Sequence, residues 1–258
     1  MKKFITLIGY CLLLVAAILI LIKFALINYG RIDRNQNIIL GDSHIEFVDV
    51  EGLANFSTGG APMKTLFIGI QMIDVKNKKV FISIGPHTFA DYRTSRYSDK
   101  NKNKEWIYTM DTLIPKRLNI YQTWWKLPNS RKELYRIAKL YSPKPIYDVE
   151  TNLTDTLLDR TISRHYPNEY INDTTERKWF NKIISHVHKN GGKVFLIEMP
   201  IHEDYLKRIP TKYLVRYDSI TSRFENVIRF NHPPDSLFRD GDHILPKYQS
   251  EFLARGIN

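Results

Sequence analysis

The stretch Ile38-Ile39-Leu40-Gly41-Asp42-Ser43-His44 decides the fold, because an apolar run stops at a glycine and a serine follows two residues later. A short run of Ile and Leu bounded by a turn signal predicts a buried strand. Gly41 permits a sharp exit from that strand. Ser43 is then held at the carboxyl end of a strand, where open α/β sheets bind their ligands.

Four further segments predict strands, and most predicted strands are followed by a helical stretch. The expected strands are 37–40, 54–57, 79–84, 193–199 and 226–230, and the expected helices are 63–74, 174–189, 203–223 with a break at Pro210, and 246–254. This alternation predicts an α/β fold with a mostly parallel, five-stranded sheet and helices on both faces. We expect one domain over 31–258. It carries an irregular insertion at about 90–150, which either shapes an acceptor cleft or is a surface excursion.

The first thirty residues predict a membrane anchor. Residues 4–22 form a run of nineteen without a charged side chain, which is long enough to cross a bilayer as one transmembrane helix. The alternative is a cleaved signal peptide, but no small-x-small cleavage site precedes Arg31. We therefore expect an uncleaved single-pass anchor over 1–30, with the following domain extracytoplasmic.

Composition limits the classes of partner and metal site. The formal net charge is +11, which suits a solvated basic face or attraction to an anionic lipid or glycan. No nucleic-acid-binding motif is present, so we expect no nucleic acid partner. Cys11 is the single cysteine, which excludes an internal disulfide and a cysteine-based zinc site.

Two segments far apart in the sequence carry the residue types of nucleophilic catalysis. Ser43 is the candidate nucleophile, and a serine hydroxyl attacks only when a base takes its proton. His243, in Asp240-Gly241-Asp242-His243, is the candidate base. Asp240 would orient its imidazole; Asp242 competes for this role, but the spacing favours Asp240. The hypothesis requires Ser43 and His243 to share a pocket.

An attack on an ester carbonyl also requires donors for the developing oxyanion. We expect these to be the backbone N–H groups of Ser43 and of Gly59 or Gly60, in Thr58-Gly59-Gly60-Ala61-Pro62. The alternative is that the two glycines make a plain tight turn. We expect His44 to lie at the surface or at a helix start rather than to take part in catalysis.

These blocks resemble those of the SGNH (GDSL-type) hydrolases over most of 37–258. Gly41-Asp42-Ser43 resembles the first block with its serine nucleophile, Gly59 or Gly60 the second-block glycine, and Asp240 with His243 the Asp-x-x-His block. The resemblance implies a three-layer α/β/α sandwich, and ester hydrolysis or acyl transfer without a metal. We expect no cofactor.

The third block departs from the family pattern of Gly-x-Asn-Asp, whose asparagine donates to the oxyanion. The corresponding stretch is Gly85-Pro86-His87-Thr88, with His87 in the place of the asparagine. An N–H of His87 would then be an oxyanion-hole donor. The alternative is that His87 caps a turn.

The predicted function is that of a membrane-anchored serine esterase or O-acyltransferase acting on acyl esters of a cell-envelope glycan or lipid. The expected partners are that acylated glycan or lipid, the membrane, and a membrane protein that donates the acyl group. Two alternatives stay open: a non-catalytic SGNH-like module that binds envelope glycan, and a scaffold for a membrane acyl donor.

Overall fold

The computed structural model describes residues 36–71, 73–90, 153–166 and 174–257, together with parts of the segment 6–18. The chain divides into two compact units, Met1–Arg34 and Asn35–Asn258. The insertion expected at about 90–150 lies outside the described residues beyond residue 90.

The described residues of the first unit are helical, at position 6 and over 9–15 and 17–18. Their large apolar side chains, among them Leu12, Leu13 and Leu14, are exposed. No helix in the described residues has both the length and the apolar character needed to cross a bilayer. The run 4–22 is only partly described, so the anchor stays a prediction.

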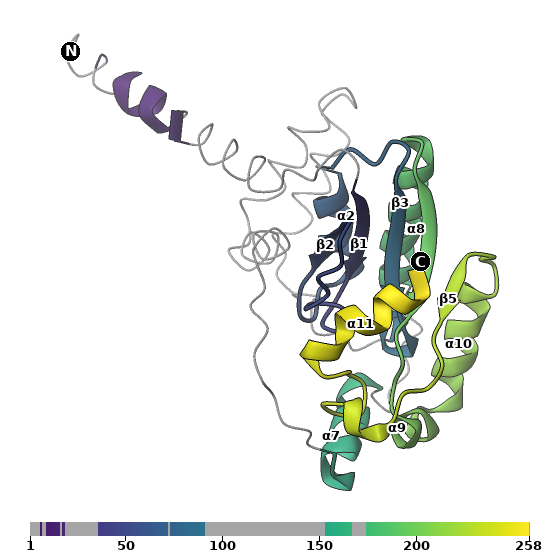
Figure 1. Ribbon diagram of the computed structural model, residues 1–258. Helices are drawn as coiled ribbons and strands as arrows, with labels where there is room; N and C mark the ends of the chain where they lie inside the picture. Colours follow the sequence, from purple (N-terminus) through teal and green to yellow (C-terminus); the bar gives the residue numbers. More distant parts are fainter. Residues whose placement is uncertain are drawn as a thin grey trace. The chain divides into compact units, whose positions relative to one another are not determined.

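A five-stranded sheet forms the centre of the second unit (Figure 1). Its strands are β1 (Asn37–Gly41), β2 (Leu53–Ser57), β3 (Lys79–Ile84), β4 (Lys193–Glu198) and β5 (Val227–Arg229). Their order is β2-β1-β3-β4-β5, and every neighbouring pair is parallel. The predicted α/β class and the five predicted strands are therefore confirmed, and the sheet is parallel throughout.

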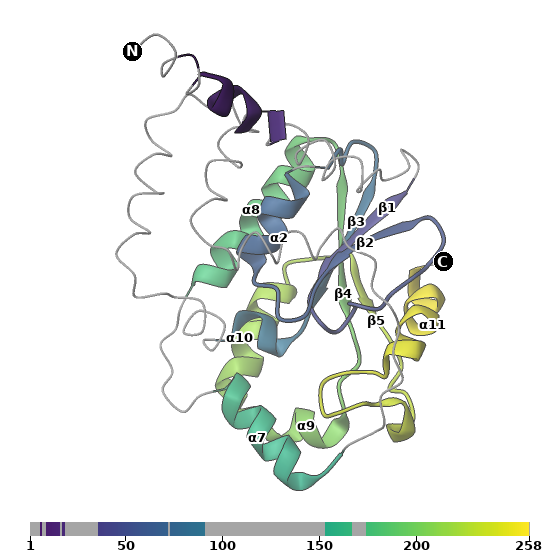
Figure 2. The ribbon, with the colours of Figure 1, turned by 90° about the vertical axis from the view of Figure 1, so that its left-hand side faces the viewer.

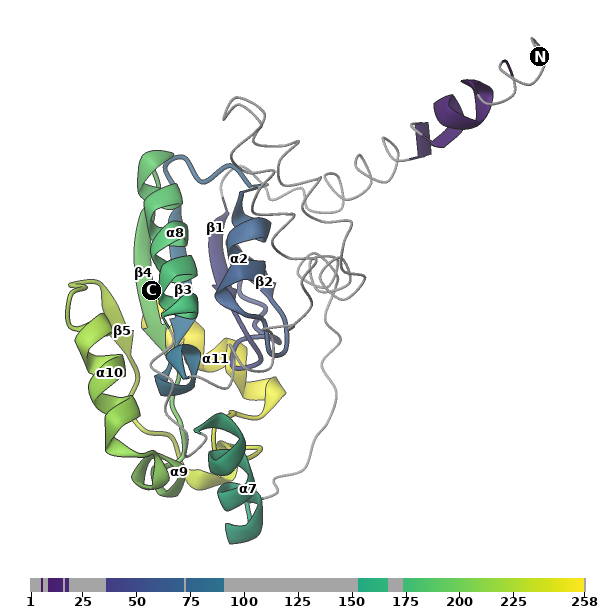
Figure 3. The same ribbon diagram turned by 180° about the vertical axis from the view of Figure 1, so that it is seen from behind.

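Helices lie on both sides of this sheet. They are α2 (Met63–Ile70), α7 (Asp155–His165), α8 (Thr175–Lys189), α9 (Glu203–Arg208), α10 (Thr211–Thr221) and α11 (Pro246–Ile257), with short 3-10 turns η1 (Pro86–Phe89) and η3 (Asp235–Leu237). Figures 2 and 3 show α2, α8 and α10 on one side of the sheet and α11 on the other. Pro210 separates α9 from α10 as expected, because proline lacks the N–H that a helix interior uses.

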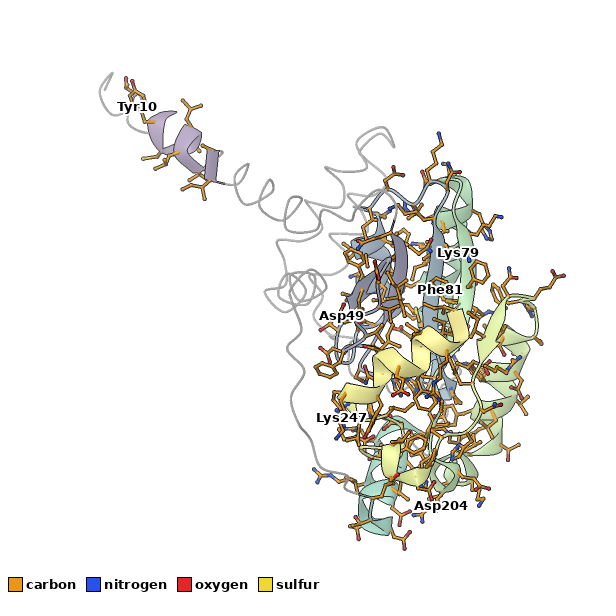
Figure 4. All side chains as sticks on the ribbon, viewed as in Figure 1. Tyr10, Asp49, Lys79, Phe81, Asp204 and Lys247 are labelled. Atoms are coloured by element: carbon orange, nitrogen blue, oxygen red, sulfur yellow. The ribbon has the colours of Figure 1, made fainter. Side chains whose placement is uncertain are left out.

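Continuous apolar runs bury the central strands on both faces. β1 and β3 are buried from their second residue onward, as is typical of parallel strands covered by helices. On the α11 side, Ile39, Phe81 and Ile197 from three neighbouring strands pack in one cluster with Leu253 of α11. Figure 4 shows side chains filling this layer, including Phe81.

The strand order reverses at β1, which has β2 on one side and β3 on the other. The chain passes from β1 to β2 on one side and then to β3 on the other side of β1. Open parallel sheets bind ligands beyond the carboxyl ends of the strands where the order reverses in this way. The residues beyond those ends are 42–44 after β1 and 85–88 after β3.

Candidate active site

The exit from β1 is closely packed around Gly41. A Cβ at this position would come within 2.6 Å of the Ile45 side chain and 2.8 Å of Ser83 Cβ, so only glycine fits without a shift. The chain after it is held from β2, because Asn55 Nδ2 donates to the carbonyls of Ile45 (2.9 Å) and Val48 (2.8 Å). These contacts fix the segment that carries Ser43, whose side chain is half-buried.

A tight turn near the C-terminus carries the candidate base. Phe238 and Ile244 form an antiparallel bridge, and the N–H of Arg239 donates to the His243 carbonyl at 2.8 Å. Inside the turn, the Gly241 carbonyl accepts from the N–H of His202 at 2.9 Å. The turn therefore presents Asp240, Asp242 and His243 on a rigid support.

Gln249 of α11 links the two segments across about 200 residues of sequence. Its Oε1 accepts from the N–H of Phe47 at 3.0 Å, and its Nε2 donates to the carbonyls of Ser43 and Ile244, each at 3.4 Å. Gln249 is buried, so each of these bonds forms away from water. Buried polar groups of this kind normally find partners, and here the partners join the first and last parts of the domain.

Ser43, His243 and Asp240 form a continuous chain of side-chain contacts. Ser43 Oγ is 2.7 Å from His243 Nε2, and His243 Nδ1 is 2.8 Å from Asp240 Oδ1. Ser43 and His243, about 200 residues apart in the sequence, are therefore in direct contact, as the sequence hypothesis requires. Asp240 Oδ1 also accepts from the backbone N–H groups of Asp242 (3.2 Å) and His243 (2.9 Å), and Arg239 Nε donates to Oδ2 at 2.9 Å.

Asp242 is the second carboxylate in contact with His243, the candidate base. Its Oδ1 lies 2.9 Å from His243 Nδ1, almost as close as that of Asp240. Burial lowers the pKa of His243, but the charges of Asp242 and Asp240 outweigh it and raise this pKa to about 10. Burial would raise the pKa of Asp242, yet the charges of His243, His165 and His44 hold it well below the ordinary value.

His44 is buried, so the expected position at the surface or at a helix start is wrong. Its ring stacks between two others, 4.1 Å from the ring of His87 at an interplanar angle of 12° and 4.4 Å from that of His243 at 22°. Its Nδ1 lies 2.7 Å from Asp42 Oδ1, and its Nε2 lies 3.7 Å from Asp242 Oδ2. Burial is possible because carboxylates face both ring nitrogens.

The expected oxyanion donors lie at the same edge of the sheet. Gly59 and Gly60 follow β2 after one intervening residue, Thr58, and Gly60 has a φ of 66°, which suits the tight turn that was the alternative explanation. His87 follows β3 and is buried, and its Nε2 lies 3.1 Å from Asp42 Oδ2. That nitrogen is therefore engaged with a carboxylate. The role of all three residues at an oxyanion stays a prediction.

Two groups of described side chains bring ligand atoms close enough for a shared metal ion: Asp42, His44 and His87, and His44, Asp242 and His243. In each group two imidazoles are stacked nearly parallel. A histidine binds a metal in its ring plane at about 2.0–2.1 Å, and one ion cannot lie in two stacked planes. The geometry favours a network of ion pairs over a metal centre.

Sequence reasoning missed the outer part of this network. His165, at the end of α7, has Nδ1 at 2.7 Å from the Tyr205 hydroxyl and at 3.5 Å from Asp242 Oδ2. Its Nε2 lies 3.0 Å from Arg164 Nη2. The one local signal was a histidine in the last turn of a capped helix, which is common in helices without any site.

The comparisons with known proteins add no relative to this geometry: no protein-family model matches the chain, and no curated protein matches it.

Proposed function

We propose that this protein is a serine esterase or O-acyltransferase in which Ser43 is the nucleophile, His243 the base and Asp240 the residue that orients the base. The observation that carries the proposal is the 2.7 Å contact between Ser43 Oγ and His243 Nε2, continued by the 2.8 Å contact to Asp240. A nucleophile within hydrogen-bond reach of a base that is itself oriented by a third group is the geometric signature of covalent catalysis.

In the proposed reaction, the Ser43 hydroxyl donates its proton to neutral His243 Nε2 as the oxygen attacks an acyl carbonyl. The backbone N–H groups of Ser43 and of Gly59 or Gly60 stabilise the oxyanion, with His87 as the further predicted donor. The His243 imidazolium then gives its proton to the departing alkoxide. Water or a sugar hydroxyl, deprotonated by His243, then attacks the acyl-serine carbonyl, and His243 returns the proton to the Ser43 oxygen as the bond between that oxygen and the acyl group breaks.

The cellular setting of the proposal comes from the sequence. The apolar run 4–22 and the net charge of +11 support an anchored, extracytoplasmic enzyme acting on acylated envelope glycan or lipid, with a membrane acyl donor as partner. The layered sheet, with α11 on one side and α2, α8 and α10 on the other, supports the three-layer sandwich of the SGNH resemblance (Figure 2).

The second candidate is a glycan-binding module without catalysis. The position of His87 favours it, because the residue in the place of the family's asparagine has its Nε2 against Asp42. In such a module the Ser43 hydroxyl would have no chemical role.

Labelling with a fluorophosphonate probe separates the two candidates. The full-length chain should become covalently modified at Ser43, as located by mass spectrometry, and Ser43→Ala should abolish the modification. Ser250→Ala is the matched control, because the Ser250 hydroxyl bonds to the backbone groups of Asp49 and Phe47 and lies outside the proposed triad. Absence of labelling in the wild-type chain at pH 9, with folding intact, would favour the binding module.

A further inference from the structure

Asp242 is a buried carboxylate without a conventional hydrogen bond. Its side chain is 1% exposed, and neither oxygen has a hydrogen-bond partner within the described part of the chain. A buried charge in this state costs several kcal/mol unless opposite charges surround it. The residue therefore depends on its neighbours for its ionised form.

Three imidazoles supply that environment. Asp242 Oδ1 lies 2.9 Å from His243 Nδ1, and Oδ2 lies 3.5 Å from His165 Nδ1 and 3.7 Å from His44 Nε2. These are ion-pair distances with poor hydrogen-bond alignment. The Asp242 carboxylate therefore acts on the neighbouring imidazoles mainly through its charge, and it does little to orient their rings.

Asp240 has the opposite character. One of its oxygens accepts from two backbone N–H groups as well as from His243, and the other accepts from Arg239. Its side chain is 20% exposed. Since Arg239 and the amides already balance much of its charge, Asp240 is well suited to orient a ring and poorly suited to dominate its electrostatics.

We infer that two carboxylates divide the work of a single triad aspartate: Asp240 orients His243 through an aligned hydrogen bond, and Asp242 is a positioning residue whose buried charge stabilises the protonated ring. This inference rests on the proposed function and adds a residue to it. Burial lowers the pKa of His243. In the opposing rise the charge of Asp242 contributes more than that of Asp240, whereas the hydrogen bond to Asp240 contributes more than the contact with Asp242.

The charged and titratable groups around the pair come from four parts of the fold. His243 faces Ser43, Asp240, Asp242 and the ring of His44. Beyond them, Arg239 faces Asp240, His165 faces Asp242, and Asp42 and His87 face His44. Each variant below removes one carboxylate charge and leaves every other member of this set in place.

The test is an NMR titration of His243 in the full-length chain carrying Ser43→Ala, compared with the same chain carrying Asp240→Asn or Asp242→Asn. An opposite charge at contact distance shifts a pKa by about one to three units. Asp242→Asn should lower the His243 midpoint by at least about one pH unit, and by more than Asp240→Asn does. Asp240→Asn should instead mix the two neutral tautomers, as read from the ring ¹⁵N shifts.

Asp235→Asn is the control, since it removes a carboxylate 3.2 Å from a different histidine, His202, and should leave His243 unchanged. A midpoint that falls as far in Asp240→Asn as in Asp242→Asn, or that stays constant in Asp242→Asn, would overturn the inference. A second measurement needs no aspartate variant: in Ser43→Ala, the Asp242 carboxyl ¹³C shift should follow the titration of His243 with larger amplitude than that of Asp240. Equal or smaller amplitude counts against the inference.

These readouts do not require turnover, so the two hypotheses fail separately. Absence of fluorophosphonate labelling together with the expected order of midpoints would refute the proposed function and leave the division of roles standing. Labelling of Ser43 together with the reverse order of midpoints would support the proposed function and refute the division of roles between Asp240 and Asp242.

Discussion

The reactivity of Ser43 should depend steeply on pH, and this dependence follows from the surroundings of His243. The ring accepts a proton from Ser43 only through an unprotonated Nε2. Two carboxylates lie at 2.8 and 2.9 Å from the opposite nitrogen and, against the effect of burial, raise the pKa of His243 to about 10. With that pKa, most molecules should hold His243 as an imidazolium at neutral pH, and only the minority with a neutral ring should react.

The magnitude follows from the proton equilibrium, which changes tenfold for each pH unit below the pKa. Roughly one molecule in a thousand holds neutral His243 at pH 7, and roughly one in ten at pH 9. The second-order rate of fluorophosphonate labelling should therefore rise about 100-fold between pH 7 and pH 9, reach about half of its maximum near pH 10 and level off only above that pH.

The assay measures labelling rates at fixed ionic strength over short reaction times, with Ser43→Ala as the blank at each pH. Circular dichroism on the same samples establishes that the fold persists up to pH 10. A labelling rate that reaches its plateau below pH 8 would refute the argument, because it would show that the two carboxylates do not stabilise the imidazolium in the way their distances require.

Two further predictions concern stability. The pKa of His243 is higher in the folded chain than the ordinary 6.5, so protonated His243 contributes to the free energy of unfolding fully below about pH 6.5, and this contribution is lost as the pH rises towards about 10. Urea unfolding at pH 6, 8 and 10 should therefore give a falling free energy of unfolding, and a flat profile would contradict this. Gly41→Ala should destabilise the fold by about 1–3 kcal/mol, because a Cβ would meet Ile45 and Ser83 at 2.6 to 2.8 Å; an unchanged urea midpoint would show that the β1 exit can relax.

The sheet was predictable because its strands are short apolar runs with clear punctuation. Gly41 ends β1, Gly85 follows β3, and Asn190-Gly191-Gly192 separates α8 from β4. Runs buried on both faces carry no alternating pattern, so length and bounding turn residues were the usable signals. The strand order was not predictable, since neighbours in this sheet such as β3 and β4 are separated by more than a hundred residues.

Helix α7 was missed for a different reason. Its buried residues are Leu158, Thr161 and His165, which do not form an apolar stripe. The available signal was local: Thr154 caps the helix by accepting from the N–H of Leu157, with Asp155 in the first turn. Such a cap predicts a helix start only when an apolar period follows it, and here two of the three inward-facing side chains are polar.

The proposed triad was predictable to the extent that its residues carry chemistry on their own. Serine after a strand end and Asp-x-x-His near the C-terminus restricted the candidates, and the structure brings them together. The surrounding ion pairs were not predictable. His44 is an ordinary polar residue in sequence, and its burial depends on Asp42 two residues away and on Asp242 about 200 residues away. The cost of burying a histidine is set by its partners, which only the fold brings together.

The composition of that buried network bears on the choice between an enzyme and a binding module. Asp42, Asp242 and the stacked rings of His44, His87 and His243 lie in a region from which water is largely excluded. Ion networks of this kind are rarely a source of stability, because apolar residues of similar volume usually stabilise a fold as well or better. A module that only held glycan at its surface would gain nothing from the free-energy cost of burying these ion pairs next to a half-buried serine. A base that must gain and lose a proton does have a use for it, since the nearby charges set the pH at which the proton moves.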